Sequence, residues 1–339
     1  MSAPKTSHVS EETLVSNFSV AQADTGKRLD AYLSEQIEGW SRSRLQRLID
    51  DGDVLVNQKT AKPSSKLHEG DEIDVDLIEV PAARFEPENI ELDIVFEDGS
   101  LAVVNKPAGM IVHPGAGVSS GTLANALAFH FGLADAELAG HPGEGRDSKI
   151  QNLKTKIGIV HRLDKDTSGL MVVAKTQEVH EALSDQFRDR EVFKQYVALV
   201  HGATRDNSGR IDKSLARDRW HRTKMTIAAN GRNALTVWKV RQRFGKFTLL
   251  EVEIKTGRTH QIRVHLASLN HPLVGDTTYN EGRDNTVADS DVNRAIESMK
   301  RAFLHAEKLS FRHPATAETM QFSQAMPDEL MRFLDIIGP

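Results

Sequence analysis

The chain contains no cysteine in its 339 residues. This absence excludes disulfide bonds, zinc sites built on thiolates and cysteine nucleophiles, and it is compatible with a reducing compartment. No apolar run approaches the length that a helix needs to cross a bilayer, and the N-terminus lacks the basic-then-apolar order of a secretion signal. We therefore expect a cytoplasmic protein without a membrane partner.

Two further signatures are missing from the sequence. It has no glycine-rich loop of the kind that cradles phosphates, and no spacing of ligand residues typical of a metal site. The sequence thus predicts neither a bound metal nor a small-molecule cofactor. The hydrophobic and charged fractions, 39% and 27%, are those of an ordinary globular protein, and the length allows two domains.

Positive charge is in deficit, because the formal net charge is −5. That sum argues against a nucleic-acid partner, since phosphate binding draws on Lys and Arg. The distribution argues the other way: residues 209–246 hold eleven basic side chains against two acidic ones, while acids gather in 69–79 and 86–98. We interpret the basic stretch as an RNA-facing surface. The alternative is a solvated surface without a partner.

The N-terminal part predicts a short lead-in followed by a small domain. Residues 1–14 are polar and without periodicity, which is typical of disorder. In the following segment, residues 29–37 and 41–49 carry apolar side chains at helical spacing. Two short strands follow at 54–57 and 72–76.

This order of elements resembles the small RNA-binding module named after ribosomal protein S-four. The resemblance rests on Arg28-Leu29-Asp30, Ser41-Arg42-Ser43, Gly52-Asp53-Val54-Leu55-Val56-Asn57 and Gly70-Asp71. It implies an α/β RNA-binding domain over residues 15–82, in which the second helix lies against RNA. Arg42, Arg44 and Arg47 would then contact phosphates. The alternative is that these three arginines are solvated helix residues.

A polar loop between two apolar runs stands out at residues 158–175. Runs at 159–160 and 170–174 favour strands, and the loop between them carries Asp164 ahead of a turn-forming cluster at 166–169. Loops held by such a scaffold often present catalytic groups. Turns also collect aspartate for local reasons, so the pattern alone leaves both interpretations open.

Four segments together resemble the RluA/RluD-type RNA pseudouridine synthases. They are 161–170 (HRLDKDTSGL), 105–109 (NKPAG) with His113-Pro114, 194–200 (KQYVALV) and 256–265 (TGRTHQIRVH). The resemblance implies an α+β pseudouridine synthase fold, with a mixed, mostly antiparallel sheet, flanking helices and a central cleft. The catalytic domain would span 93–339, behind a linker at 83–92. Prolines and small residues at 80–87 mark this boundary.

The same resemblance assigns roles to individual residues. Asp164 would be the nucleophile, at either the ribose or the base, and Arg263 the cation that binds it in bidentate geometry. Tyr196 would stack on the base and remove a proton from it. Arg162 would fill the gap left by the flipped nucleotide, or alternatively pair with Asp166.

Four further side chains are expected to contact RNA: Lys106, His113, His260 and Gln261. A structural role is the alternative for His113. The function implied is the isomerisation of specific uridines in ribosomal RNA, in the 23S RNA of the large subunit, by a monomer without a cofactor. Three alternatives remain at this point: a non-catalytic RNA-binding factor for ribosome assembly, a synthase acting on tRNA, and a carboxylate-based glycosidase.

The remaining elements follow from periodicity. The sequence predicts a β-hairpin at 94–104, helices at 122–131, 178–188, 260–269 and 328–337, strands at 192–201, 235–238, 248–255, 303–306 and 309–311, and loops at 132–156 and 280–293.

Overall fold

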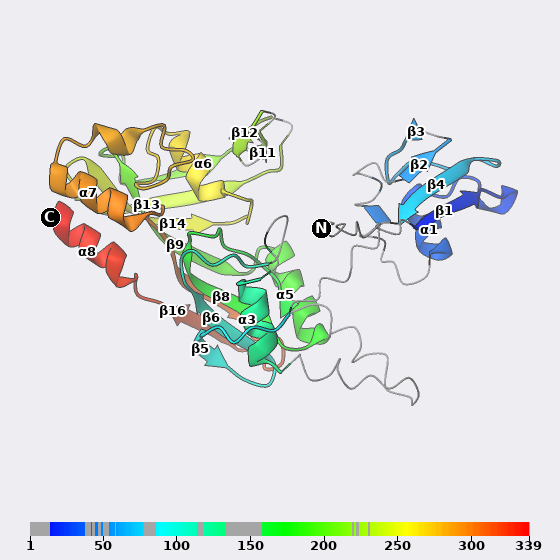
Figure 1. Cartoon of the computed structure of the whole chain (residues 1–339), viewed down its shortest axis with the longest axis horizontal. Coiled ribbons are helices and arrows are strands. Elements are labelled where there is room, and N and C mark those ends of the chain that lie inside the picture. The colour runs from blue at the N-terminus through cyan, green and yellow to red at the C-terminus, as the bar shows by residue number, and fades with distance from the viewer. Residues whose placement is uncertain are drawn as a thin grey trace, which may run out of the picture. The chain divides into compact units, whose positions relative to one another are not determined.

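The computed structural model describes residues 14–37, 42, 45–46, 49, 54–57, 59–77, 86–113, 118, 120–132, 158–218, 220–221, 224–229 and 231–338. The chain divides into two compact units, Met1–Ala83 and Arg84–Pro339 (Figure 1). Nearly all of the expected lead-in and of the 132–156 loop, and part of the expected linker, lie outside the described residues. Within those residues, no helix is both long and apolar enough to cross a membrane.

The first unit is a small antiparallel sheet with a helix packed on it. Its strands run in the order β1-β4-β2-β3, with bounds β1 (Leu14–Ser19), β2 (Val54–Val56), β3 (Lys59–Thr60) and β4 (Glu72–Leu77). A short 3-10 helix η1 (Gln22–Asp24) precedes α1 (Leu29–Gln36). Leu29 and Leu33 of α1 meet Ile73 and Val75 of β4 in the core, as the helical and alternating patterns predicted. Strand β1 had no clear signal in the sequence.

The second unit is built on a ten-stranded sheet. Eight strands follow the order β10-β13-β14-β9-β15-β8-β6-β5, while β16 pairs with β15 and β7 with β8. Their bounds are β5 (Asp93–Glu97), β6 (Leu101–Lys106), β7 (Gly158–Ile159), β8 (Ser168–Ala174), β9 (Phe193–His201), β10 (Ser208–Asp212), β13 (Leu235–Phe244), β14 (Phe247–Ile254), β15 (Leu304–Arg312) and β16 (Thr319–Ser323). Strands β8 and β15 pair in parallel, and the other pairs among these described strands are antiparallel.

Helices surround this sheet, and a separate two-stranded hairpin, β11 (Leu215–Arg217) with β12 (Met225–Ile227), stands beside it (Figure 1). The helices are α3 (Leu123–His130), α5 (Gln177–Arg188), α6 (Gln261–Ala267), η2 (Arg283–Thr286), α7 (Ser290–Met299) and α8 (Asp328–Ile337). The central strand β9 is buried on both faces. Tyr196 and Ala198 join one cluster with α3 and α6, while Val197 and Leu199 join another with α7 and α8.

Local sequence signals account for most of these elements. Thr122 caps α3 and shares a capping box with Asn125, so the helix begins where the sequence predicted. The prediction of a loop at 280–293 is wrong, because this range contains η2 and the first turn of α7. The Asp289 carboxylate caps α7 by accepting bonds from the Asp291 and Val292 amides, and Val292 and Ile296 are the apolar side chains that anchor it. Strands β10, β11, β12 and β16 were also not expected.

Candidate active site

The Asp164 loop joins β7 to β8, so its two ends are fixed in one sheet. The Asp164 carbonyl accepts a hydrogen bond from the Thr167 amide at 3.1 Å, which closes the turn. Gly169 has a φ of +119°, and a Cβ there would lie 2.3 Å from the Ala306 carbonyl oxygen. Only glycine fits this close approach of β8 to β15. The loop is therefore held in place where the carboxylate side chain is presented.

Two buried cations support this loop from within the protein. The Lys106 Nζ donates to the carbonyl oxygens of Pro107, Met110 and Lys165 at 2.7, 2.8 and 3.0 Å. The Arg301 guanidinium donates to the Ser168 Oγ at 3.0 Å. Ser168 also contacts the His305 Nδ1 at 2.9 Å. The turn is thus braced by side chains from β6 and from the start of β15.

This placement of Lys106 corrects the expectation that it contacts RNA. Its side chain is 0% exposed and its three donors are all used by backbone carbonyls. Burial lowers the pKa of Lys106 to about 7, while three carbonyl acceptors favour the ammonium form. Asp166, on the same turn, is exposed, and among the described residues its carboxylate makes no hydrogen bond or ion pair. The side chains that support the turn are Lys106 and Arg301.

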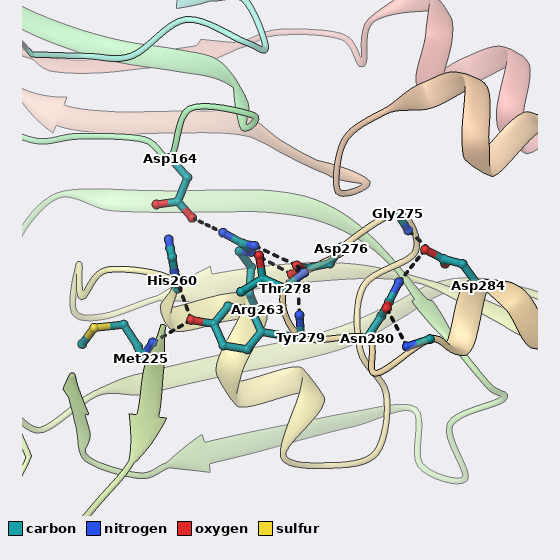
Figure 2. Close-up of polar contacts among 11 residues, drawn as sticks. Asp164, Met225, His260, Arg263, Gly275, Asp276, Thr278, Tyr279, Asn280 and Asp284 are labelled. Carbon is teal, nitrogen blue, oxygen red and sulfur yellow. Dashed lines mark hydrogen bonds and ion pairs between the residues drawn. The ribbon is translucent and has the colours of Figure 1, made fainter. Parts of the chain in front are cut away.

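Arg263 on α6 lies between two carboxylates (Figure 2). Its Nε and Nη2 each donate to an oxygen of Asp276 at 2.7 Å, and its Nη1 reaches the Asp164 Oδ2 at 3.4 Å. The expected bidentate pair with Asp164 is therefore wrong: the bidentate partner is Asp276, and the contact with Asp164 is single and longer. Burial opposes the charge, but hydrogen-bonded Asp276 outweighs it and raises the pKa of Arg263.

Tyr279 and His260 complete the wall around Arg263. The Arg263 guanidinium lies 5.0 Å from the centre of the Tyr279 ring, within the range of a cation–π contact. The Tyr279 hydroxyl accepts from the Met225 amide at 2.8 Å and contacts the His260 Nδ1 at 2.7 Å. His260 precedes α6 in a left-handed conformation, with φ of 55°. Burial lowers its pKa, so the neutral imidazole faces Asp164 in Figure 2.

Gln261 is the second residue whose expected RNA contact the structure replaces. Its side chain is buried, and its amide nitrogen donates to the Leu235 carbonyl and the Thr236 hydroxyl, both at 3.0 Å. Its carbonyl oxygen accepts from the Thr256 hydroxyl and the Arg258 amide. All of its polar atoms are used inside the protein, so Gln261 anchors the start of α6 to β13.

Asp164, Tyr196 and Arg263 line one cavity, together with Arg162, His260 and the 257–259 turn. The three residues come from a loop, a strand and a helix that are far apart in sequence. Tyr196 lies in β9 and is almost completely buried. Burial, followed by the nearby Asp164 charge, raises the pKa of the Tyr196 phenol. At neutral pH this wall therefore presents a neutral hydroxyl.

The remaining predicted contacts divide between the two units. Arg162 is exposed at the mouth of the cavity, and among the described residues it forms no ion pair with Asp166. His113 is an exposed residue beside a neighbouring hollow. In the first unit, Arg42 is half-exposed and donates to the buried Asp30 at 3.0 Å. Arg44 and Arg47 lie outside the described residues.

The cavity can perform nucleophilic and electrostatic chemistry. A partly exposed carboxylate faces a guanidinium that is locked in orientation by a second, buried carboxylate. No group of three or more potential metal ligands occurs among the described residues. Sequence reasoning missed Asp276 and Tyr279. Asp276 follows a short apolar run and Gly275, which is typical of a turn after a buried segment. No local sequence pattern connects Asp276 to Arg263.

Comparison with known proteins adds to this geometry. A family model described as RNA pseudouridylate synthase matches residues 100–268, and one described as S4 domain matches residues 27–73. The first range includes Asp164, Tyr196 and Arg263. The second includes α1, β2, β3 and the start of β4.

Individual proteins are similar over most of the chain. Ribosomal large subunit pseudouridine synthase D of Xanthomonas campestris pv. campestris is 40% identical over 319 residues, which cover 94% of this chain and 91% of that protein. An uncharacterised RNA pseudouridine synthase of Bacillus subtilis, YlyB, is 37% identical, covering 94% and 97%. The solved structure of human RNA pseudouridylate synthase domain containing 4 aligns with a TM-score of 0.54 at 25% identity, over 72% of this chain and 92% of that one.

Proposed function

Since this chain belongs to the RNA pseudouridylate synthase family, we propose that it isomerises specific uridines to pseudouridine in ribosomal RNA of the large subunit. The observation that carries the proposal is the convergence of Asp164, Tyr196 and Arg263 on one cavity. The substrate follows from the names of the similar proteins, several of which are large-subunit synthases.

Asp164 is the nucleophile of this proposal. The reaction breaks the bond between uracil nitrogen 1 and the ribose, turns the base, and rejoins it through carbon 5. Carbon 5 loses its proton to water, and nitrogen 1 takes up a proton. The carboxylate holds one fragment covalently while the base turns, at the ribose or at the base. Arg263 orients that carboxylate, and Asp276 keeps Arg263 in place.

Tyr196 packs against the base and offers it a neutral phenol. Its raised pKa works against a direct role as proton acceptor, because burial beside Asp164 disfavours the phenolate. We therefore assign the ring a positioning role during rotation of the base. We do not assign removal of the carbon 5 proton to a phenolate form of Tyr196.

RNA recognition draws on both units. The target uridine must leave its stack to enter the cavity, at a cost of a few kcal/mol. Arg162 at the mouth fills the vacated place with its planar guanidinium. Arg42, with Arg44 and Arg47, holds flanking phosphates. The isomerisation causes no net oxidation or reduction, so the proposed reaction uses no redox cofactor. We also propose that the protein acts as a monomer in the cytoplasm.

Release of tritium from RNA labelled at uracil carbon 5 tests the proposal. Wild-type protein should release tritium from large-subunit ribosomal RNA and not from tRNA transcripts. Asp164→Asn should bind the RNA but release none, since an amide is not a nucleophile here. Asp166→Asn is the matched control, because this exposed neighbour lies on the same turn without lining the cavity, and it should retain turnover.

Other outcomes separate the alternatives. Binding without tritium release by the wild type would support a non-catalytic assembly factor. Free uracil among the products would support a glycosidase, and release from tRNA alone would change the substrate. Retained turnover in Asp164→Asn would remove Asp164 from the nucleophile role.

A further inference from the structure

A second hollow, of about 450 Å³, adjoins the catalytic cavity. The two share Arg162, Tyr196, Ile254, Gly257 and Arg258 as a common wall. None of the described residues that line the second hollow is an aspartate or a glutamate, whereas the lining includes arginine, lysine and histidine. A concave surface with cations and no carboxylate favours an anionic ligand.

Lys194 is the most unusual group in this hollow. Its side chain is only 7% exposed, and its Nζ lies 5.0 Å from the centre of the Phe187 ring. Among the described residues, its ammonium makes no hydrogen bond or ion pair within contact distance. Buried lysines are rare unless they are paired. The ammonium therefore lacks the anion that would offset its burial.

The surroundings of Lys194 do not supply that anion. Glu253 acts on it only at longer range and is itself paired with Lys255. Burial, followed by the charge of Lys255, lowers the pKa of Lys194 to about 8, so the group is mostly protonated at neutral pH. His161 beside it remains neutral, since burial lowers its pKa to about 3.

The other cations of the hollow differ in how far they are already paired. Arg188 binds Asp185 on its own helix and Asp189 directly after that helix. Arg258 makes one long bond of 3.4 Å to the Asn233 carbonyl. Arg258, Arg162 and Lys194 thus remain as charges without a carboxylate partner among the described residues.

Lys194 and Tyr196 are two residues apart in β9, so both side chains leave the same face of the strand, about 7 Å apart. Tyr196 lines both the catalytic cavity and the second hollow, whereas Lys194 lines the second hollow. We propose that the second hollow is a subsite for a phosphodiester adjacent to the flipped uridine, with the Lys194 ammonium donating to a non-bridging oxygen. This inference rests on the proposed function, because it concerns the same bound RNA.

A thermodynamic cycle on the full-length protein tests the subsite. The probe is a stem-loop RNA containing the modified uridine, made with a native backbone or with one neutral methylphosphonate on the 5′ or the 3′ side of that uridine. On wild-type protein, the methylphosphonate should lower kcat/KM by about tenfold or more at one of the two positions. Lys194→Met should lower kcat/KM on native RNA similarly, with no further loss on the neutral RNA.

Lys308→Met is the matched control. Lys308 is an exposed lysine on β15 that lines neither hollow, so this variant should keep the full sensitivity to methylphosphonate. Thermal unfolding of Lys194→Met checks that it is folded, and Lys194→Gln replaces it if it is not.

Two results would overturn the subsite while leaving the proposed function intact. One is wild-type turnover that is insensitive to methylphosphonate at both positions, which needs no variant to interpret. The other is an equal loss from Lys194→Met on native and neutral RNA, as expected for a merely structural lysine. Absence of tritium release from native RNA by the wild type would instead refute the proposed function, and the subsite with it.

Discussion

Among the described residues, each structural unit has one fully buried aspartate that binds arginine side chains. The exposure of those arginines differs between the two units. In the first unit, Asp30 accepts bonds from Arg28 and Arg42, whose side chains remain 46% and 50% exposed. In the second unit, Asp276 holds Arg263, which is only 14% exposed and has its Nη1 directed at Asp164. The same kind of pair therefore orients arginines at the surface of the first unit and an arginine in the cavity of the second unit.

The difference lies in what remains for the guanidinium to do. Arg42 uses one nitrogen on Asp30 and keeps its other donors at the surface, where phosphates can reach them. Arg263 uses two nitrogens on Asp276, which leaves the third for Asp164. A buried carboxylate thus orients an arginine, and the surroundings decide whether the remaining donors of that arginine face solvent or a second carboxylate.

Arg263→Lys should produce the largest effect. An ammonium cannot hold both oxygens of Asp276 and also reach Asp164, so we expect kcat/KM to fall by roughly 10²–10³-fold in the tritium-release assay. RNA binding in a filter assay should change little. Arg241→Lys is the control, at a half-exposed arginine that pairs with the buried Glu307. Wild-type turnover in Arg263→Lys would show that bridging the two carboxylates is unimportant.

Asp276→Asn should have the next largest effect. The amide keeps the shape but loses the charge, so Arg263 becomes an incompletely paired buried cation. We expect a loss of kcat of about 10–100-fold and a fall in the free energy of unfolding of about 3 kcal/mol. Asp284 is the half-buried partner of the buried His201, and Asp284→Asn should lower stability without a comparable loss of kcat. Equal losses of kcat in both variants would contradict an orienting role for Asp276.

Asp30→Asn should affect stability but not chemistry. Hydrogen bonds from Arg28, opposed by burial and supported by Arg42 and Gln46, hold the pKa of Asp30 well below its usual range. The contribution of Asp30 to the free energy of unfolding is therefore complete above an unfolded-state pKa of about 3.9. This contribution is lost as the pH falls toward the folded-state pKa.

Hydrogen exchange of α1 and β4 amides measures this contribution. At pH 7 we expect Asp30→Asn to lower the stability of the first unit by about 3 kcal/mol, and the gap to the wild type should narrow below pH 4. Turnover on a minimal stem-loop should be unchanged. A parallel loss of turnover would mean that Asp30 does more than orient surface arginines.

For Tyr196, we expect no effect of phenol ionisation on the pH profile of kcat. Since burial raises the pKa of Tyr196 above its ordinary value, the phenol should stay protonated between pH 7 and 10. The kcat profile of the wild type should therefore show no rise from a tyrosinate near pH 10, when compared with Tyr196→Phe. A rise that only the wild type shows would reinstate Tyr196 as the proton acceptor.

Sequence patterns predicted the frame of the site well. The family, the α+β fold and the loop that carries Asp164 followed from motifs and strand signals, and the family and fold are confirmed by the comparisons and the structure. Helix α8 and the β5–β6 hairpin fall at or near their predicted bounds. These features depend on periodicity over a few residues, which a single sequence displays directly.

The partners of the predicted residues could not be read in the same way. A lysine after a strand is usually exposed, and only the fold shows three carbonyls converging on Lys106. Gln261 looks like a recognition residue until its neighbours on β13 are known. Asp276 acts on Arg263 through a turn without a local signature. Helix α7 was missed because its start is polar and only two buried side chains anchor it.

The parallel pairing of β8 with β15 has a consequence for biosynthesis. Ser168, next to the catalytic turn, bonds to His305, 137 positions further along the chain, and Arg301 reaches it from a similar separation. Contacts of such long separation form late, because the intervening polypeptide must first be made and brought back. A growing chain that stops before β15 would thus lack a finished active site, and competence should arise only after β15 has been translated.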